Sequence, residues 1–77
     1  MSVDFNEVVV EVLEKNVVGL QLEANMMDQT LGDIGVDSLD VMLVMMDIQE
    51  KTGIVIPDES VDELTTPNKI INYLKSR

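Results

Sequence analysis

The sequence predicts an all-α fold, a small four-helix bundle of three main helices and one short helix. A long loop is expected between the first and second helices. Three segments carry apolar residues at helical spacing, and helix start or stop signals flank them. Residues 54–56 alone show strand propensity, and no second convincing strand exists to pair with them. A length of 77 residues suits one domain spanning residues 1–77.

The first helix is predicted over residues 3–18, with Gly19 marking its end. Its apolar side is formed at helical spacing by Phe5, Val8, Val9, Val12 and Leu13. The other side, which we interpret as a solvated face, carries Glu7, Glu11, Glu14 and Lys15.

The connection over residues 19–36 is longer than is usual in a compact domain, which predicts a loop that is functional or packed down. Packing is favoured by its apolar residues, which are Leu20, Leu22, Met26, Met27, Leu31 and Ile34. The loop leads to Asp37-Ser38-Leu39, where a hydroxyl stands at the expected start of an apolar helix. Binding residues are often placed on loops in this way.

The second helix is predicted from Ser38 to Thr52, with Gly53 as its stop. Either Asp37 or Ser38 is its N-cap, and Asp40 is a weak capping-box partner.

Two apolar stripes run along this second helix. One consists of Val41, Val44, Met45 and Ile48, and the other of Leu39, Met42, Leu43 and Met46. Only one stripe can be the main core face. The other is either buried because the helix lies centrally, or an exposed docking face with adaptable methionine side chains.

The last third of the chain is predicted to hold the short helix and the final helix. Residues 54–56 form an extended connector that stops at Pro57, and a capping box from Ser60 to Glu63 opens a very short helix near Leu64. Thr66 and Pro67 are the N-cap and first-turn proline of the final helix. Its apolar side is formed by Ile70, Ile71, Tyr73 and Leu74.

Composition excludes several classes of function. Fifteen acidic residues against five basic ones give a net charge of −10, which repels nucleic acids and anionic membranes and attracts basic protein surfaces. The chain has no Cys and no His, so a self-contained catalytic site is hard to build. The longest apolar run, residues 41–46, is too short to span a bilayer. We expect a monomeric cytoplasmic protein that is not an enzyme, binds no nucleic acid and inserts into no membrane.

Several motifs together resemble the acyl carrier protein family. They are the run Asp33-Ile34-Gly35-Val36-Asp37-Ser38-Leu39-Asp40, the turn Ile56-Pro57-Asp58-Glu59 and the Thr65-Thr66 start of the final helix. The resemblance is clearest over residues 31–74, and the first helix agrees in length and pattern.

This resemblance implies that a phosphopantetheinyl transferase moves 4′-phosphopantetheine from coenzyme A onto Ser38. Acyl or related groups would then be carried as thioesters on the arm. A helix start suits a phosphodiester, because unpaired N–H groups and the positive end of the helix dipole lie there. The other implied partners are an acyl-loading ligase or acyltransferase, and ketosynthases or other pathway enzymes with basic docking patches.

The resemblance also implies roles around the serine. Asp37 would help the transferase to recognise its target, and Leu39 would anchor in partner pockets, although these residues also suit an N-cap and a partial core. Asp40, Asp47 and Glu50 match the acidic contacts that the family offers to basic partners. An exposed second stripe would add Met42, Leu43 and Met46 to the docking residues.

The sequence departs from the common fatty-acid carriers, which tend to be acidic at the positions of Leu43, Gln49 and Lys51. Thr52 stands where those carriers usually place an aromatic core residue, and we expect Ile54 to fill the gap. These departures favour fatty-acid-like, polyketide or other specialised biosynthesis over housekeeping fatty-acid biosynthesis.

Three alternatives differ in kind. The domain could be an adaptor that carries no cargo, which the second stripe favours, or an aminoacyl or peptidyl carrier, whose polar cargo would stay outside the helices. A calcium loop starting at Asp33 is excluded, because Gly35, Ser38 and Val44 occupy its positions 3, 6 and 12. No metal site is predicted.

Overall fold

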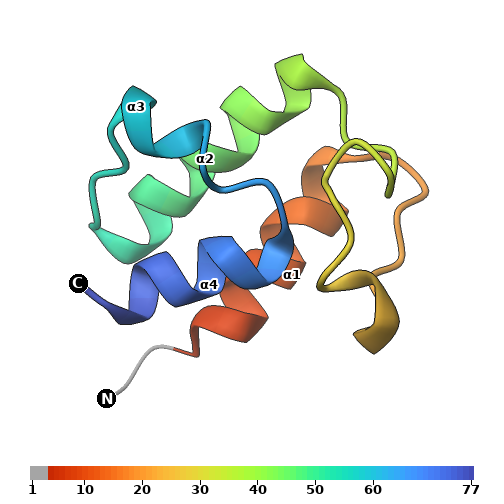
Figure 1. The fold of residues 1–77 in the computed structure, drawn as a ribbon, viewed down its shortest axis with the longest axis horizontal. Helices are drawn as coiled ribbons and strands as arrows, with labels where there is room; N and C mark the ends of the chain where they lie inside the picture. The colour runs from red at the N-terminus through yellow and green to blue at the C-terminus, as the bar shows by residue number, and fades with distance from the viewer. Residues whose placement is uncertain (1–3) are drawn as a thin grey trace.

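The computed structural model describes residues 4–77, and all regular structure in that range is helical. Figure 1 shows four α-helices: α1 (Phe5–Asn16), α2 (Ser38–Thr52), α3 (Asp58–Val61) and α4 (Pro67–Lys75). One 3₁₀ turn, Ala24–Met26, lies in the long loop between α1 and α2. The predicted all-α bundle of three main helices and one short helix is confirmed.

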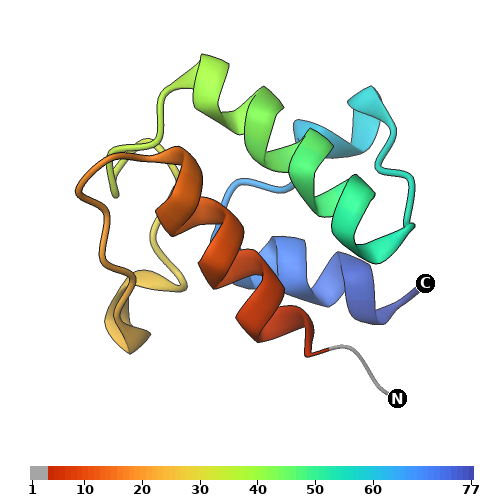
Figure 2. The ribbon, with the colours of Figure 1, turned by 180° about the vertical axis from the view of Figure 1, so that it is seen from behind.

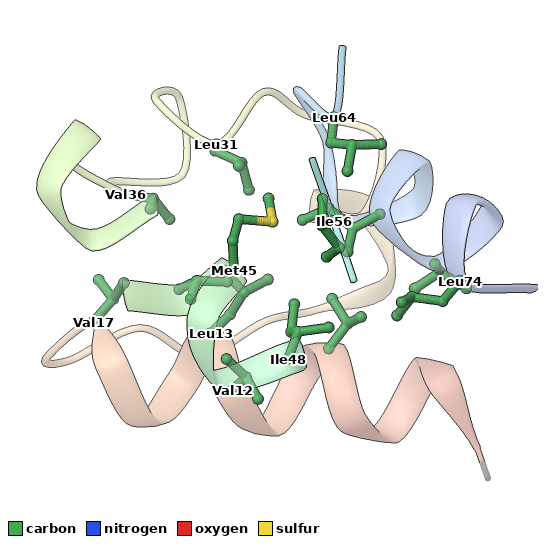
Figure 3. Packing of buried hydrophobic residues seen from close by; sticks show 14 residues of the cluster. Val12, Leu13, Val17, Leu31, Val36, Met45, Ile48, Ile56, Leu64 and Leu74 are labelled. Atoms are coloured by element: carbon green, nitrogen blue, oxygen red, sulfur yellow. The ribbon is translucent and has the colours of Figure 1, made fainter. Parts of the chain in front are cut away.

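The core is organised around α1, which packs against both α2 and α4. Figure 2 shows α1 and α2 running side by side, with the start of α4 behind α1. Figure 3 shows the side chains that meet in the core, including Leu13 from α1, Ile48 from α2 and Leu74 from α4, each of them 0% exposed. The apolar stripes read from the sequence for α1 and α4 are therefore confirmed as core faces.

The bounds of α1 differ slightly from those expected. The predicted first residue, Val3, lies outside the described residues. The helix ends at Asn16 because Val17 takes an extended conformation, with φ −115° and ψ 108°. Gly19 follows in the turn with φ 82°, a left-handed conformation that glycine adopts without strain.

The long loop is packed down, as its apolar residues predicted. Leu31 is 5% exposed and its N–H donates to Thr65 O at 2.8 Å, which ties the loop to the segment before α4. Asn68 N–H donates to Met27 O at 3.0 Å and makes a second tie. Glu14, expected on a solvated face, accepts from Leu22 N–H at 2.9 Å and so holds the start of the loop against α1.

The position of the short helix was predicted wrongly. The capping box at Ser60 was expected to open it near Leu64, whereas α3 begins at Asp58, directly after its N-cap Pro57. Ser60 N–H already donates to Pro57 O at 2.9 Å, so Ser60 lies inside the first turn and cannot cap it. Asp58 and Glu59 occupy that first turn, where the helix dipole favours acidic side chains.

The final helix was predicted correctly. Thr66 is its N-cap and accepts from Lys69 N–H at 3.1 Å, and Pro67 fills the first helical position. The preceding residues 54–56 form an extended connector, as expected. Ile56 is buried and Ile54 packs partly against the core, next to the position of Thr52.

Candidate functional site

The start of α2 presents an exposed serine. Ser38 is the first residue of the helix, and Asp37 is the N-cap, with Asp37 Oδ1 accepting from Ser38 N–H at 2.8 Å. Asp40 lies in the first turn but does not close a capping box among the described residues. Because Asp37 supplies the cap, the Ser38 hydroxyl is not committed to capping and faces solvent.

The backbone around Ser38 favours an anion. The first hydrogen bond of the α2 ladder runs from Val41 N–H to Asp37 O at 2.9 Å, so the N–H groups of Leu39 and Asp40 precede it without intrahelical partners. The positive end of the helix dipole adds to this preference. The carboxylates of Asp37 and Asp40 oppose it, so a phosphate attached here is best placed on the open, water-screened side of the helix start.

A groove of about 480 Å³, which we call the serine hollow, begins at Ser38. Its walls come from α2, from the loop before it and from the segment between α3 and α4. Most of the lining is apolar, and it consists of Leu31, Val41, Met42, Val61 and Leu64. Thr30 and Thr65 add hydroxyl groups, and Gly32 and Asp62 complete the lining. The exposed hydroxyl therefore stands beside a place where an apolar chain can lie.

A second groove of about 280 Å³, the methionine hollow, lies further along α2 on the side of α3. It is lined by Met42, Met45, Met46, Gln49, Ile56, Asp58, Val61 and Asp62. In Figure 3 the Met45 side chain leaves α2 and points towards Leu31 and Ile56. A third hollow, of about 420 Å³, lies at the loop after α1 and does not include Ser38.

The two apolar stripes of α2 are separated cleanly. Val44, Met45 and Ile48 are buried, and Val41 is half-buried. The other stripe is exposed, with 70% of Leu39, 63% of Met42, 52% of Leu43 and 62% of Met46 open to solvent. Of the two alternatives for the second stripe, burial or exposure, the structure therefore shows exposure. An exposed apolar patch of this kind usually marks a surface that binds a partner.

The acidic residues assigned to docking do not share one environment. Glu50 is exposed, Asp40 is half-buried, and Asp47 is bound to α1 through two contacts. Asp47 Oδ2 lies 3.7 Å from Lys15 Nζ and accepts from Asn16 Nδ2 at 3.3 Å. The structure therefore exposes Asp37 and Glu50, while Asp40 is half-buried and the charge of Asp47 is partly engaged with α1.

The departures from common carriers have structural roles here. Gln49 Oε1 accepts from Ile56 N–H at 2.8 Å and so holds the connector after α2. Lys51 Nζ lies 3.8 Å from Glu11 Oε1 on α1. Thr52 Oγ1 donates to Ile48 O at 2.7 Å and accepts from Ile54 N–H at 3.2 Å, which closes the end of the helix.

Sequence reasoning missed the walls of the grooves. Leu31 was assigned only to packing, and Val61 and Leu64 were assigned to no site. Their one signal in the sequence is that they are apolar residues in polar segments. Leu31 stands in the long loop, and Val61 and Leu64 flank the acidic pair Asp62 and Glu63. That signal cannot show which side of a loop will face the serine.

No helix within residues 4–77 is both long enough and apolar enough to cross a bilayer. Asp33, Asp37 and Asp40 do not gather, since the same range holds no group of three potential ligands placed to share a metal ion.

Comparison with known proteins identifies a family over most of the chain. The family described as "Phosphopantetheine attachment site" matches residues 6–74. An acyl carrier protein of Exiguobacterium sp. is 36% identical over 75 residues, covering 97% of this chain and 90% of the relative. An acyl carrier protein of Wolinella succinogenes is 36% identical over 73 residues, covering 95% and 91%. One of Campylobacter concisus is 33% identical over 72 residues, covering 94% and 88%.

The start of α2 fits a phosphopantetheine group. Ser38 offers an exposed oxygen that can form the phosphodiester, and the N–H groups of Leu39 and Asp40 can face the phosphate. The serine hollow adjoins the same oxygen and can receive apolar parts of whatever is attached.

Proposed function

Because the chain belongs to the acyl carrier protein family, we propose that Ser38 is the residue that bears its 4′-phosphopantetheine arm. The group supplies a terminal thiol, to which acyl groups are attached as thioesters. The protein is a carrier and not a catalyst, and it works with a phosphopantetheinyl transferase and with biosynthetic enzymes.

The observation that carries this assignment is the position of the Ser38 hydroxyl. It is exposed at the first position of a 15-residue helix, is left free by the Asp37 cap, and adjoins the serine hollow. A hydroxyl is required for the phosphodiester, and the neighbouring backbone N–H groups favour the phosphate. We propose that residues 1–77 form one carrier domain around this site.

The assignment is tested by incubating the apo-protein with coenzyme A and a transferase of broad specificity, followed by intact mass measurement. We expect the mass of one phosphopantetheine to be added to the wild type and to Ser60→Ala, and nothing to be added to Ser38→Ala. Ser38→Ala keeps the Asp37 cap, so the fold is preserved. The same addition to Ser38→Ala would refute the assignment.

We further propose that the exposed side of α2 is the docking surface for these enzymes. Its residues are Asp37, Leu39, Asp40, Met42, Leu43, Met46 and Glu50, with Asp47 at its edge. Apolar side chains bordered by carboxylates fit a partner surface with an apolar centre and basic groups around it. A net charge of −10 disfavours a second copy of this chain as the occupant, so we propose a monomer.

For the cargo we propose an acyl chain rather than an aminoacyl or peptidyl group. The support is that most of the surface lining the serine hollow is apolar, so that moving a charged amine into it would cost much of the hydration of that amine. We propose a specialised pathway of fatty-acid-like or polyketide type, because Leu43 leaves an apolar contact where common carriers are acidic. Work with coenzyme A and its transferase implies a cytoplasmic location in this proposal.

One observation favours a second candidate, an adaptor that uses the carrier fold without cargo. The exposed apolar stripe could serve such a role on its own. Complementation of the native host with two variants separates the candidates. The carrier proposal expects Ser38→Ala to abolish function, whereas an adaptor would tolerate Ser38→Ala and lose function with Leu43→Glu.

A further inference from the structure

The serine hollow and the methionine hollow share a boundary. Met42 of α2 and Val61 of α3 line both hollows, and Asp62 lies at the rim of both. Val61 is half-buried and packs against the core, so its position is fixed. Met42 is 63% exposed, and its side chain has three rotatable bonds. Met42 is therefore the movable part of the boundary between the two grooves.

The hollows follow one another along α2. Ser38, Val41 and Met42 line the first, and Met42, Met45, Met46 and Gln49 line the second. At about 1.5 Å of rise per residue, Met42 lies about 6 Å along the helix from Ser38, and Gln49 lies about 16 Å along it. The two grooves together thus form one path that leads away from Ser38 along α2, and the Met42 side chain interrupts it.

We propose that Met42 is the divider that determines how far an apolar cargo reaches along α2, and so which chain lengths the protein shields. A short acyl chain fills the serine hollow alone. A long chain displaces the Met42 side chain and continues into the methionine hollow, against Met45 and Met46. This inference rests on the proposed attachment at Ser38.

The exposed stripe of α2 is then divided between two tasks. Met42 and Met46 line the grooves and contact cargo, whereas Leu39 and Leu43 line neither groove and remain for a partner enzyme. Continuity with the groove that starts at Ser38 favours cargo as the occupant of the methionine hollow. A side chain of a partner has no such path from the attachment residue.

The three methionines along the grooves serve as reporters in NMR of protein labelled with ¹³C at the methionine methyl groups. The transferase loads Ser38 with butanoyl or dodecanoyl phosphopantetheine from the corresponding coenzyme A thioesters, and intact mass confirms loading. Relative to the holo form, we expect butanoyl to shift the Met42 methyl signal alone. We expect dodecanoyl to shift the signals of Met42, Met45 and Met46, while Met26 and Met27 in the long loop stay unchanged.

A second readout is the rate at which hydroxylamine cleaves the thioester. Each methylene group that moves from water into the methionine hollow should slow cleavage of long-chain cargo by up to about fourfold. Butanoyl cargo, which does not pass Met42, should show the same rate in all variants described next.

Met42→Ala tests the divider directly, and Leu43→Ala is its matched control on the same stripe. Because both residues are more than half exposed, neither change opens a cavity in the core. In Met42→Ala we expect octanoyl cargo to shift the Met46 methyl signal as far as dodecanoyl cargo shifts it in the wild type. Leu43→Ala should keep the wild-type dependence on chain length.

The outcomes are distinguishable. Absence of loading, seen by mass, refutes the proposed function and with it this inference. Loading without any response of Met45 and Met46 to dodecanoyl refutes the inference alone and assigns the methionine hollow to a partner. A dependence on chain length that Met42→Ala leaves unchanged shows that Met42 is not the divider.

Discussion

The two faces of α2 use the same kinds of side chain for opposite purposes. Val44, Met45 and Ile48 are at most 3% exposed and pack in the core around α1. Leu39, Met42, Leu43 and Met46, interleaved with them along the helix, are at least 52% exposed. Apolar character alone therefore does not determine which face joins the core.

The difference lies in what each face meets. One face lies against α1, which supplies Val9, Val12 and Leu13, all fully buried. The other face borders α3 only through the methionine hollow, and α3, a helix of four residues, leaves it more than half exposed. The exposed face is thus left open by the architecture, and its covering must come from cargo or from a partner.

Removing a side chain from the buried face should have the largest effect. Ile48→Ala deletes a fully buried side chain, and we expect unfolding to be easier by about 2–5 kcal/mol, since a cavity remains in the core. Met46→Ala, two residues away on the open face, should change stability by less than about 0.5 kcal/mol. Urea denaturation followed by circular dichroism measures both. Equal losses in the two variants would mean that the open face is packed in solution.

A charge on the open face should weaken docking without unfolding the protein. We expect Leu43→Glu to lower the transferase kcat/KM for the apo-protein by about tenfold, since an apolar contact is lost at the centre of the interface. Val18→Glu is the matched control, because Val18 is another apolar residue, 100% exposed, and lies in the loop after α1 rather than on α2. A similar decrease of kcat/KM in both variants would mean that the added negative charge, and not the loss of a docking contact, causes the decrease.

The smallest effect concerns the acidic border between the two faces. Asp47→Asn removes the charge that pairs with Lys15, and we expect a loss of about 0.5–1 kcal/mol in unfolding free energy at low salt. Glu50→Gln, on the open side, should leave stability unchanged and slow association with a basic partner. Urea denaturation and stopped-flow binding at several ionic strengths separate the two. If Asp47→Asn slowed association as much as Glu50→Gln at unchanged stability, Asp47 would belong to the open surface.

The sequence predicted the parts of the fold that are governed by local signals. Gly53 ended α2 as expected, with φ 73° in the left-handed region, and Thr66 capped α4. The capping box at Ser60 gave a wrong start for the short helix, because the helical turn had already begun after Pro57. Local patterns cannot decide between two overlapping starts when the helix that follows has only four residues.

The start of α2 was predictable from the sequence, whereas the walls of the grooves beside it were not. The adjacent residues left the N-cap open between Asp37 and Ser38, and Ser38 was singled out by the resemblance of longer motifs to a family. The grooves depend on how distant segments meet. Leu31 and Leu64 come together because Leu31 N–H binds Thr65 O, a contact across 34 positions of sequence, from 31 to 65. Whether the second stripe was exposed depended likewise on the length of α3, which no pattern within α2 reveals.

The tie between Leu31 N–H and Thr65 O has a consequence for how the domain can change shape. It joins two loop segments that both line the serine hollow, and it lies outside the contacts of α1 with α2 and α4. Cargo that widens the groove can therefore strain this backbone hydrogen bond, worth about 0.5–1.5 kcal/mol, while the packing of α1 against α2 and α4 stays in place. Breaking this one hydrogen bond would allow the two loop segments to move apart at the serine hollow while the three main helices stay packed.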